Sequence, residues 1–145
     1  MTEGDGAGAF RWPVRVYYQD TDGGGVVYHA SYLRFLERAR TEWLRALGLE
    51  QRDLAREHGV LFAVRRMEVD YLRPARLDDL LQVTARLLRR GRASLELAQE
   101  VLRPPEPEPL CRALVRLACV DVAALRPRPL PGPLLTELER GRRLD

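Results

Sequence analysis

The sequence predicts an α+β fold in which one long helix is wrapped by a curved antiparallel sheet of about five strands. Three observations support this prediction: one stretch with helical spacing of apolar residues, four later stretches that alternate with period two, and a glycine-rich turn that joins a first strand to the helix. With 145 residues and 46% hydrophobic content, the chain is long enough to bury one compact core. We therefore expect residues 1–145 to form a single domain.

The first strand and the helix occupy the N-terminal half. Residues 12–18 alternate apolar and polar side chains and predict a strand, preceded by a frayed N-terminus at residues 1–10. Residues 31–47 carry an apolar stripe at helical spacing, which predicts a helix that Gly48 ends. Residues 50–58 predict a second, short helix before Gly59. The stripe consists of Tyr32, Phe35, Leu36, Ala39, Trp43, Ala46 and Leu47.

The rest of the chain changes to period two. Strands are predicted at residues 60–72, where Arg65 interrupts an apolar row at odd positions, at 79–88, at 95–101 and at 111–119. Breaks at residues 74–76, 89–92 and 104–109 separate them, the last with four prolines that cannot donate to a sheet. Residues 127–145 predict a proline-rich tail followed by one or two helical turns. Because such a sheet has unpaired edges, we expect a homo-oligomer, either a dimer or a tetramer.

Composition argues against several classes of protein. The 24 basic and 21 acidic residues are dispersed and leave a net charge of +3, so no nucleic-acid-binding face is predicted. No apolar run approaches the roughly 20 residues of a membrane span, and the first ten residues lack the features of a signal peptide, so a cytoplasmic location is expected. Cys111 and Cys119 share one strand face about 26 Å apart, which predicts buried free thiols rather than a disulfide.

The turn at residues 18–29 is the candidate active site. Gly23, Gly24 and Gly25 let the backbone adopt positive φ angles and approach a ligand closely, and the following helix offers unpaired N–H groups at its start. A carboxylate would then face a group of backbone donors. This combination suits attack on a carbonyl group, since the donors stabilise the negative charge that develops on its oxygen.

Other chemistries fit this turn less well. Asp20, Asp22 and Gly25 match positions 1, 3 and 6 of a calcium loop, but Ser31 stands where the bidentate glutamate is required. A phosphate-binding loop lacks its Gly-Lys-Ser/Thr, and a Ser-His-Asp triad lacks a serine in a nucleophile elbow. No metal site is predicted. Asp22 alone could also be a turn residue that bonds its own backbone.

The segment FRWPVRVYYQDTDGGGVVYHASYLRFLERARTEWLR (residues 10–45) resembles the hotdog-fold acyl-CoA thioesterases of the 4-hydroxybenzoyl-CoA thioesterase family. It is most similar to their YbgC-like, Tol-Pal-associated branch. Residues 64–67, 71–79 and 126–131 resemble the same branch, so the resemblance covers about residues 10–131. It implies a hotdog fold and hydrolysis of acyl-CoA to a free acid and coenzyme A, with no cofactor beyond the coenzyme A of the substrate. A tetramer is the assembly that it favours.

The resemblance also assigns residues. It implies that Asp22 is the catalytic carboxylate, either as nucleophile or as general base, while Asp20 orients its neighbours. Backbone N–H groups near Tyr28 and His29 would hold the carbonyl oxygen, with their side chains around the thioester and Gly25 in contact with substrate. Arginine forks suit the phosphates of coenzyme A, which makes two clusters candidates for binding it. These are Arg89, Arg90 and Arg92, and Arg126 and Arg128.

Two rival functions remain open from the sequence. One is a hotdog-fold dehydratase, whose substrates are attached to acyl carrier protein. Such enzymes place the catalytic carboxylate on the helix, whereas Asp22 precedes the helix. The other is a non-enzymatic protein that binds acyl carrier protein or envelope machinery. The sequence does not decide which acyl chain the protein prefers. It also does not decide which of the two arginine clusters binds coenzyme A.

Overall fold

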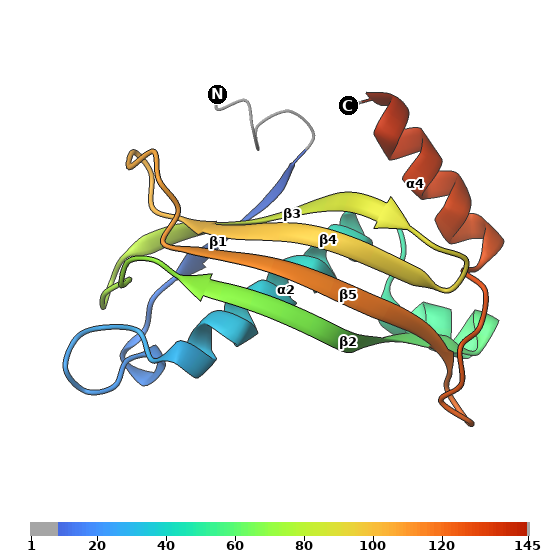
Figure 1. The fold of residues 1–145 in the computed structure, drawn as a ribbon, viewed down its shortest axis with the longest axis horizontal. Helices are drawn as coiled ribbons and strands as arrows, with labels where there is room; N and C mark the ends of the chain where they lie inside the picture. Colours follow the sequence, from blue (N-terminus) through green and yellow to red (C-terminus); the bar gives the residue numbers. More distant parts are fainter. Residues whose placement is uncertain (1–8, 145) are drawn as a thin grey trace.

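The computed structural model describes residues 9–144 and shows an open, curved, five-stranded antiparallel sheet with one long helix across one face (Figure 1). The strand order is β1-β3-β4-β5-β2. This arrangement confirms the predicted fold class. The elements are β1 (Phe10–Arg15), η1 (Tyr18–Asp20), α2 (His29–Ala46), α3 (Gln51–Asp53), η2 (Leu54–His58), β2 (Val60–Tyr71), β3 (Leu80–Arg90), β4 (Ser94–Leu102), β5 (Cys111–Asp121) and α4 (Gly132–Leu144).

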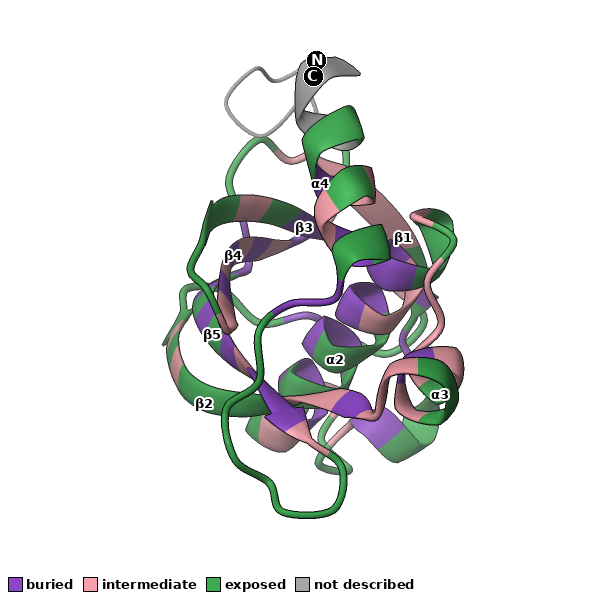
Figure 2. Ribbon diagram, turned by 90° about the vertical axis from the view of Figure 1, so that its right-hand side faces the viewer, coloured by how far each residue is buried: buried purple, intermediate pink, exposed green. Residues whose placement is uncertain are grey.

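The core lies between α2 and the sheet. The apolar stripe of α2 is buried as predicted from Tyr32 to Trp43, with Phe35, Leu36 and Ala39 fully inaccessible. At its C-terminal end the prediction is wrong, because Ala46 is exposed and Leu47 is only partly buried, while Leu44 is buried instead. The stripe faces the inward rows of β3, β4 and β5, along which buried residues alternate with less buried ones over much of each strand (Figure 2). Such alternation is expected when every second side chain of a strand points toward the helix. Burial of these side chains stabilises the fold by about 1.5–3 kcal/mol for each large one. The rows consist of Leu81, Val83, Ala85, Leu95, Leu97, Val101, Cys111, Ala113, Val115, Leu117 and Cys119.

Strand β2 corrects one sequence prediction. Its inward row was predicted at odd positions throughout, but a bulge between Val64 and Arg66 shifts the register of β2 on β5. Before the bulge Val60 and Phe62 pack on the core, and after it Met67 and Val69 do so. An extra residue reverses which side chains face inward, because successive side chains point to opposite faces. The interruption of the predicted row at Arg65 marks this bulge.

Both ends of the chain also differ from expectation. Strand β1 begins at Phe10, within the segment predicted to be frayed, while residues 1–8 lie outside the described residues. It ends at Arg15, because residues 18–20 form a 3₁₀ turn instead of extending the strand. The C-terminal helix α4 is 13 residues long rather than one or two turns. Pro133 suits its first turn, and Leu134 and Leu138, one turn apart, are buried on the core.

The two edges of the sheet are unequal. Edge strand β1 has six residues and contains Pro13, whereas edge strand β2 has 12 residues and no proline. Proline and short length are common protections against pairing with another chain. Edge β2 is therefore the one open to such pairing.

Candidate functional site

The glycine turn folds back on itself to form a short hairpin between β1 and α2. The N–H of Asp22 donates to the carbonyl of Val26 at 3.0 Å, and the N–H of Tyr28 donates to the carbonyl of Asp20 at 2.9 Å. Gly23 and Gly25 have φ angles of 89° and 94°, in the region that side chains disfavour. The glycines thus allow the tight reversal that leaves Asp22 at the exposed tip.

The two aspartates of the turn have different environments. Asp20 is only 7% exposed, and its Oδ2 accepts the N–H of Tyr17 at 2.8 Å. Asp22 is exposed, and its Oδ1 accepts the N–H of Gly24 at 2.7 Å. Within residues 9–144, no hydrogen bond is made by its Oδ2. Asp20 therefore fixes the turn, whereas Asp22 keeps one carboxylate oxygen available to a ligand.

Helix α2 begins without a side-chain cap. Tyr28 is its N-cap, and no side chain accepts a hydrogen bond from the first turn in the manner of a cap. Among the described residues, the N–H groups of His29 and Ala30 have no acceptor, while the N–H of Tyr28 is used by Asp20. The open donors thus begin one residue later than Tyr28. They lie at the positive end of the 18-residue helix, where an anionic oxygen is favoured.

A hollow of about 230 Å³ lies beside the start of α2. The His29 ring stacks on that of Tyr71 with centroids 4.5 Å apart, and Tyr32 packs edge-on against Tyr71 at 5.4 Å. Asp22 and the 59% exposed Tyr28 lie outside the wall of the hollow. The structure therefore brings His29, but neither Asp22 nor Tyr28, to this hollow. Its lining residues are Val26, Val27, His29, Tyr32, Tyr71, Leu72, Arg73 and Pro74.

Tyr32 and Tyr71 are site residues that sequence reasoning missed, because both were assigned to apolar rows. The hydroxyl of Tyr32 accepts the N–H of Ala75 at 2.9 Å, and that of Tyr71 donates to the carbonyl of His29 at 3.4 Å. Burial raises the pKa of both hydroxyls, so both are protonated at neutral pH. For Tyr32, which is only 3% exposed, the signal in the sequence was a tyrosine at an inward position, since a buried hydroxyl requires a partner. Tyr71 is 42% exposed, and no such signal marked it.

The candidate arginines gather at the other end of the sheet. The tail joins the β3–β4 hairpin there, where the N–H of Leu130 donates to the carbonyl of Arg92. Arg89 pairs with Glu96 at 3.1 Å and Arg128 with Asp121 at 3.2 Å. Among the described residues, no ion pair is made by Arg90, Arg92 or Arg126. Because β3 alone spans about 33 Å, at about 3.3 Å per residue, neither cluster lies near the glycine turn of the same chain.

The curved five-stranded sheet with one long helix across it defines the class of protein as a hotdog fold. Residues 16–138 match the family model of the thioesterase-like superfamily, and the chain belongs to that family. This finding confirms the resemblance inferred from the turn and the helix.

Individual relatives support the same assignment. The chain is 47% identical to the acyl-CoA thioester hydrolase YbgC of Escherichia coli O6:H1, over 90% of this chain and 96% of that protein. It is 45% identical to the acyl-CoA thioesterase YbgC of Haemophilus influenzae, over 84% of this chain and 88% of that protein. The crystal structure of a probable thioesterase from Bartonella henselae superposes with a TM-score of 0.80 at 39% identity, covering 85% of this chain and 99% of that one.

Residues 9–144 hold no group of three or more His, Cys, Asp or Glu side chains arranged to bind a metal ion. None of the helices in this part of the chain has the length and apolar character needed to cross a membrane. Cys111 and Cys119 are buried free thiols at opposite ends of β5, as predicted.

Proposed function

We propose that this protein hydrolyses acyl-CoA thioesters to a free acid and coenzyme A. The observation that carries the proposal is the pairing of an exposed carboxylate, Asp22, with a helix start whose His29 and Ala30 N–H groups have no acceptor among residues 9–144. A thioester carbonyl becomes negatively charged at oxygen when it is attacked, and free backbone donors at a helix start stabilise that charge. The names of the relatives support the same substrate class.

Asp22 has two routes to the products. As a nucleophile, its free oxygen attacks the carbonyl carbon, coenzyme A leaves as the thiolate, and water then cleaves the resulting anhydride. As a general base, it takes a proton from a water molecule that attacks the same carbon, and the thiolate leaves when the tetrahedral intermediate collapses. Neither route requires a metal or redox cofactor. Tyr71 and His29 provide an aromatic wall that suits the apolar part of the thioester.

In the proposed assembly, the coenzyme A part of the substrate is bound by arginines of a second copy of the chain, from the clusters at residues 89–92 and 126–128. Strand β2 starts at the arginine end, where Arg128 donates to the carbonyl of His58, and ends at Tyr71 beside the hollow. Two β2 edges paired antiparallel would place the arginine end of one copy beside the glycine turn of the other. The proposed assembly is a dimer built on this edge, with a tetramer as the final state. Light scattering that returns 16.6 kDa at micromolar concentration would contradict it.

The proposal places the protein in the cytoplasm. Its rivals are a dehydratase and a non-enzymatic protein that binds acyl carrier protein. Assays with acyl-CoA of several chain lengths separate the proposed function from both rivals, because only the thioesterase releases free coenzyme A. Acyl carrier protein tested as a competitor in the same assay would reveal a second partner.

The decisive variant is Asp22→Asn. It keeps the shape of the side chain and should lower turnover by at least about 100-fold, since loss of a general base or nucleophile costs ~10²–10⁴. The matched control is Asp20→Asn, which should lose less activity because an asparagine oxygen can still accept the N–H of Tyr17, and only the 3.7 Å ion pair of Asp20 with Arg34 is lost. Near-parental turnover in folded Asp22→Asn protein would rule out the proposed role of Asp22.

A further inference from the structure

The glycine turn is held in place by a loop that is distant in sequence. The N–H of Val27 donates to the carbonyl of Ala75 at 2.8 Å, and the N–H of Leu77 donates to the carbonyl of Gly25 at 3.0 Å. The same loop reaches the helix, since the N–H of Ala75 donates to the hydroxyl of Tyr32. Residues 73–79 therefore act as the surface against which the turn and the start of α2 are fixed.

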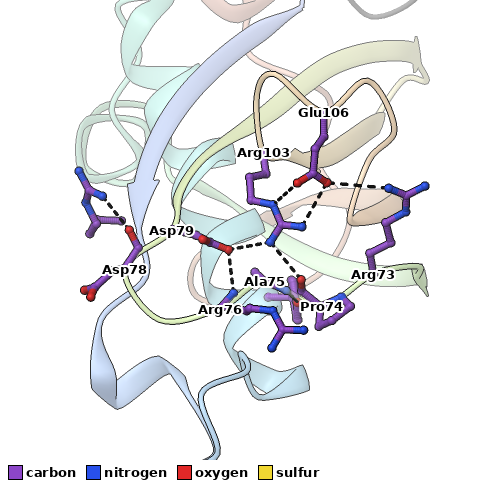
Figure 3. Close-up of polar contacts among 10 residues, drawn as sticks. Arg73, Pro74, Ala75, Arg76, Asp78, Asp79, Arg103 and Glu106 are labelled. Atoms are coloured by element: carbon purple, nitrogen blue, oxygen red, sulfur yellow. Dashed lines mark hydrogen bonds and ion pairs between the residues drawn. The ribbon is translucent and has the colours of Figure 1, made fainter.

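One guanidinium joins the two ends of this loop (Figure 3). Nη1 of Arg103 donates to Oδ2 of Asp79 at 2.8 Å and to the carbonyl of Pro74 at 3.3 Å. The same Asp79 oxygen accepts the N–H of Arg76 at 2.8 Å. Arg103 thus bridges residues 74 and 79 across the base of the loop, while Asp79 closes the loop from within.

The guanidinium is itself anchored by Glu106. Nε of Arg103 donates to Oε2 of Glu106 at 2.7 Å, and Nη2 donates to Oε1 at 3.1 Å, which is the paired geometry that arginine and carboxylate favour (Figure 3). The hydrogen bonds from Arg103 lower the pKa of Glu106, and those from Glu106 and Asp79 raise the pKa of Arg103. Both partners are therefore ionised at neutral pH, and the Arg103 side chain is only 23% exposed.

From these contacts we propose that Arg103 is a positioning residue for thioester hydrolysis, acting through Asp79 and the 73–79 loop to fix the glycine turn and the open N–H groups of α2. The inference rests on the proposed function. A bond network of this kind matters because misplacement of catalytic groups by about 1 Å costs up to about 10²-fold in rate. Lysine cannot replace Arg103, since one ammonium lacks the planar fork that reaches Glu106, Asp79 and Pro74 together.

The test compares Arg103→Lys with Arg116→Lys. Arg116 also donates twice to a carboxylate, through Nη2 at 2.5 Å and Nε at 3.1 Å, both to Oε2 of Glu96, but it lies on the exposed face of β5 away from the turn. Arg103→Lys should lower kcat for acyl-CoA by about 10-fold or more with KM changed less than about threefold. Arg116→Lys should keep both parameters at the parental values. A parental kcat in folded Arg103→Lys protein would overturn the proposal.

Hydrogen exchange gives a readout that does not depend on activity. The amides of Val27 and Leu77 should exchange at least about 10-fold faster in Arg103→Lys and at the parental rate in Arg116→Lys, because only the former loosens their acceptors. Unchanged exchange, even with reduced kcat, would refute the coupling. Glu106→Gln, which keeps the shape of the anchor, should shift both readouts in the same direction by less, and it serves as the test if Arg103→Lys does not fold. A parental protein without thioesterase activity would refute the proposed function but leave the exchange result standing.

Discussion

The two ends of the sheet differ in which groups remain open to a ligand. At both ends the backbone is bonded across the sequence, as Val27 bonds Ala75 at the glycine-turn end and Leu130 bonds Arg92 at the arginine end. The open groups at the glycine-turn end are the backbone N–H groups of His29 and Ala30, whereas those at the arginine end are the side chains of Arg90, Arg92 and Arg126, which have no ion pair among the described residues. Stabilising the negative charge that develops on the thioester oxygen requires hydrogen-bond donors that are already in position. A phosphate group can instead be bound by long arginine side chains that change conformation on binding. The difference matches the division proposed here between chemistry and coenzyme binding.

The largest effect expected at the arginine end is on substrate binding. Arg126→Ala or Arg90→Ala should raise KM for acyl-CoA with kcat mostly intact, since phosphate contacts are felt equally in the ground and transition states. Each charge-assisted contact is worth about 1.5–3 kcal/mol, or roughly 10- to 150-fold. Arg89→Ala and Arg128→Ala should change KM less, because these side chains already pair with Glu96 and Asp121.

The control substrate is an acyl-N-acetylcysteamine thioester, which lacks the nucleotide. The arginine variants should match the parent on it. Equal losses of activity on both substrates would mean that the arginine clusters support the structure. No loss of activity on either substrate would mean that these arginines are surface charges with no part in binding. Either outcome removes the proposed difference between the two ends.

A smaller effect is expected on stability, where glycine-to-alanine changes at the two ends of the sheet should differ in their cost. Gly25→Ala should lower the free energy of unfolding by about 1–2 kcal/mol, because φ is 94° there and a Cβ disfavours that conformation. Gly91→Ala in the hairpin should cost less than about 0.5 kcal/mol, since its Cβ would meet only the rotatable hydroxyl of Ser94. Urea unfolding of both variants measures the contrast, and equal costs would show that the turn is no more constrained than the hairpin.

An effect confined to alkaline pH concerns the two thiols of β5, one at each end of the sheet. Burial, aided by the charge of Asp70, raises the pKa of Cys111 to about 12. The fold thus favours the neutral thiol, so its contribution to stability is complete below the unfolded pKa of about 8.5 and is lost as pH rises toward about 12. Cys111→Ala should flatten the fall in unfolding free energy between pH 9 and 11 by up to about 1.4 kcal/mol per pH unit. Cys119→Ala should flatten it less, because Arg128 opposes the upward shift of its pKa.

These unfolding series are run under reducing conditions at matched urea concentrations. An identical pH slope in the parent and in Cys111→Ala would mean that Cys111 has an ordinary pKa in the folded protein.

Local pattern was sufficient to predict the inward rows of β5 and of β3 as far as Ala85, because successive side chains of a strand point to opposite faces. The register of β3 on β4 shifts between Leu87 and Arg89, beyond that row. Local pattern failed before the bulge of β2, where one extra residue reversed the parity that Leu61 and Ala63 had suggested. The site was predicted as a turn with a carboxylate and a helix start. The identity of the open donors was not, because the use of the Tyr28 N–H depends on how the turn folds back onto Asp20. No local signal links Arg103 to a turn about 80 residues earlier, so that contact required the structure.

The bulge in β2 also affects whether further copies of the chain could add to one another through the β2 edge. A regular 12-residue edge offers another strand many equivalent registers, and edges of that kind are templates for open-ended aggregation. In the proposed dimer, the bulge between Val64 and Arg66 would make the two halves of this edge unlike and favour the register in which the bulges of the two copies are related by a two-fold axis. A two-fold interface uses the same edge on both copies and leaves no free β2 edge for a further strand. One irregular residue would thus favour a closed β2–β2 pair over a fibre that grows through this edge.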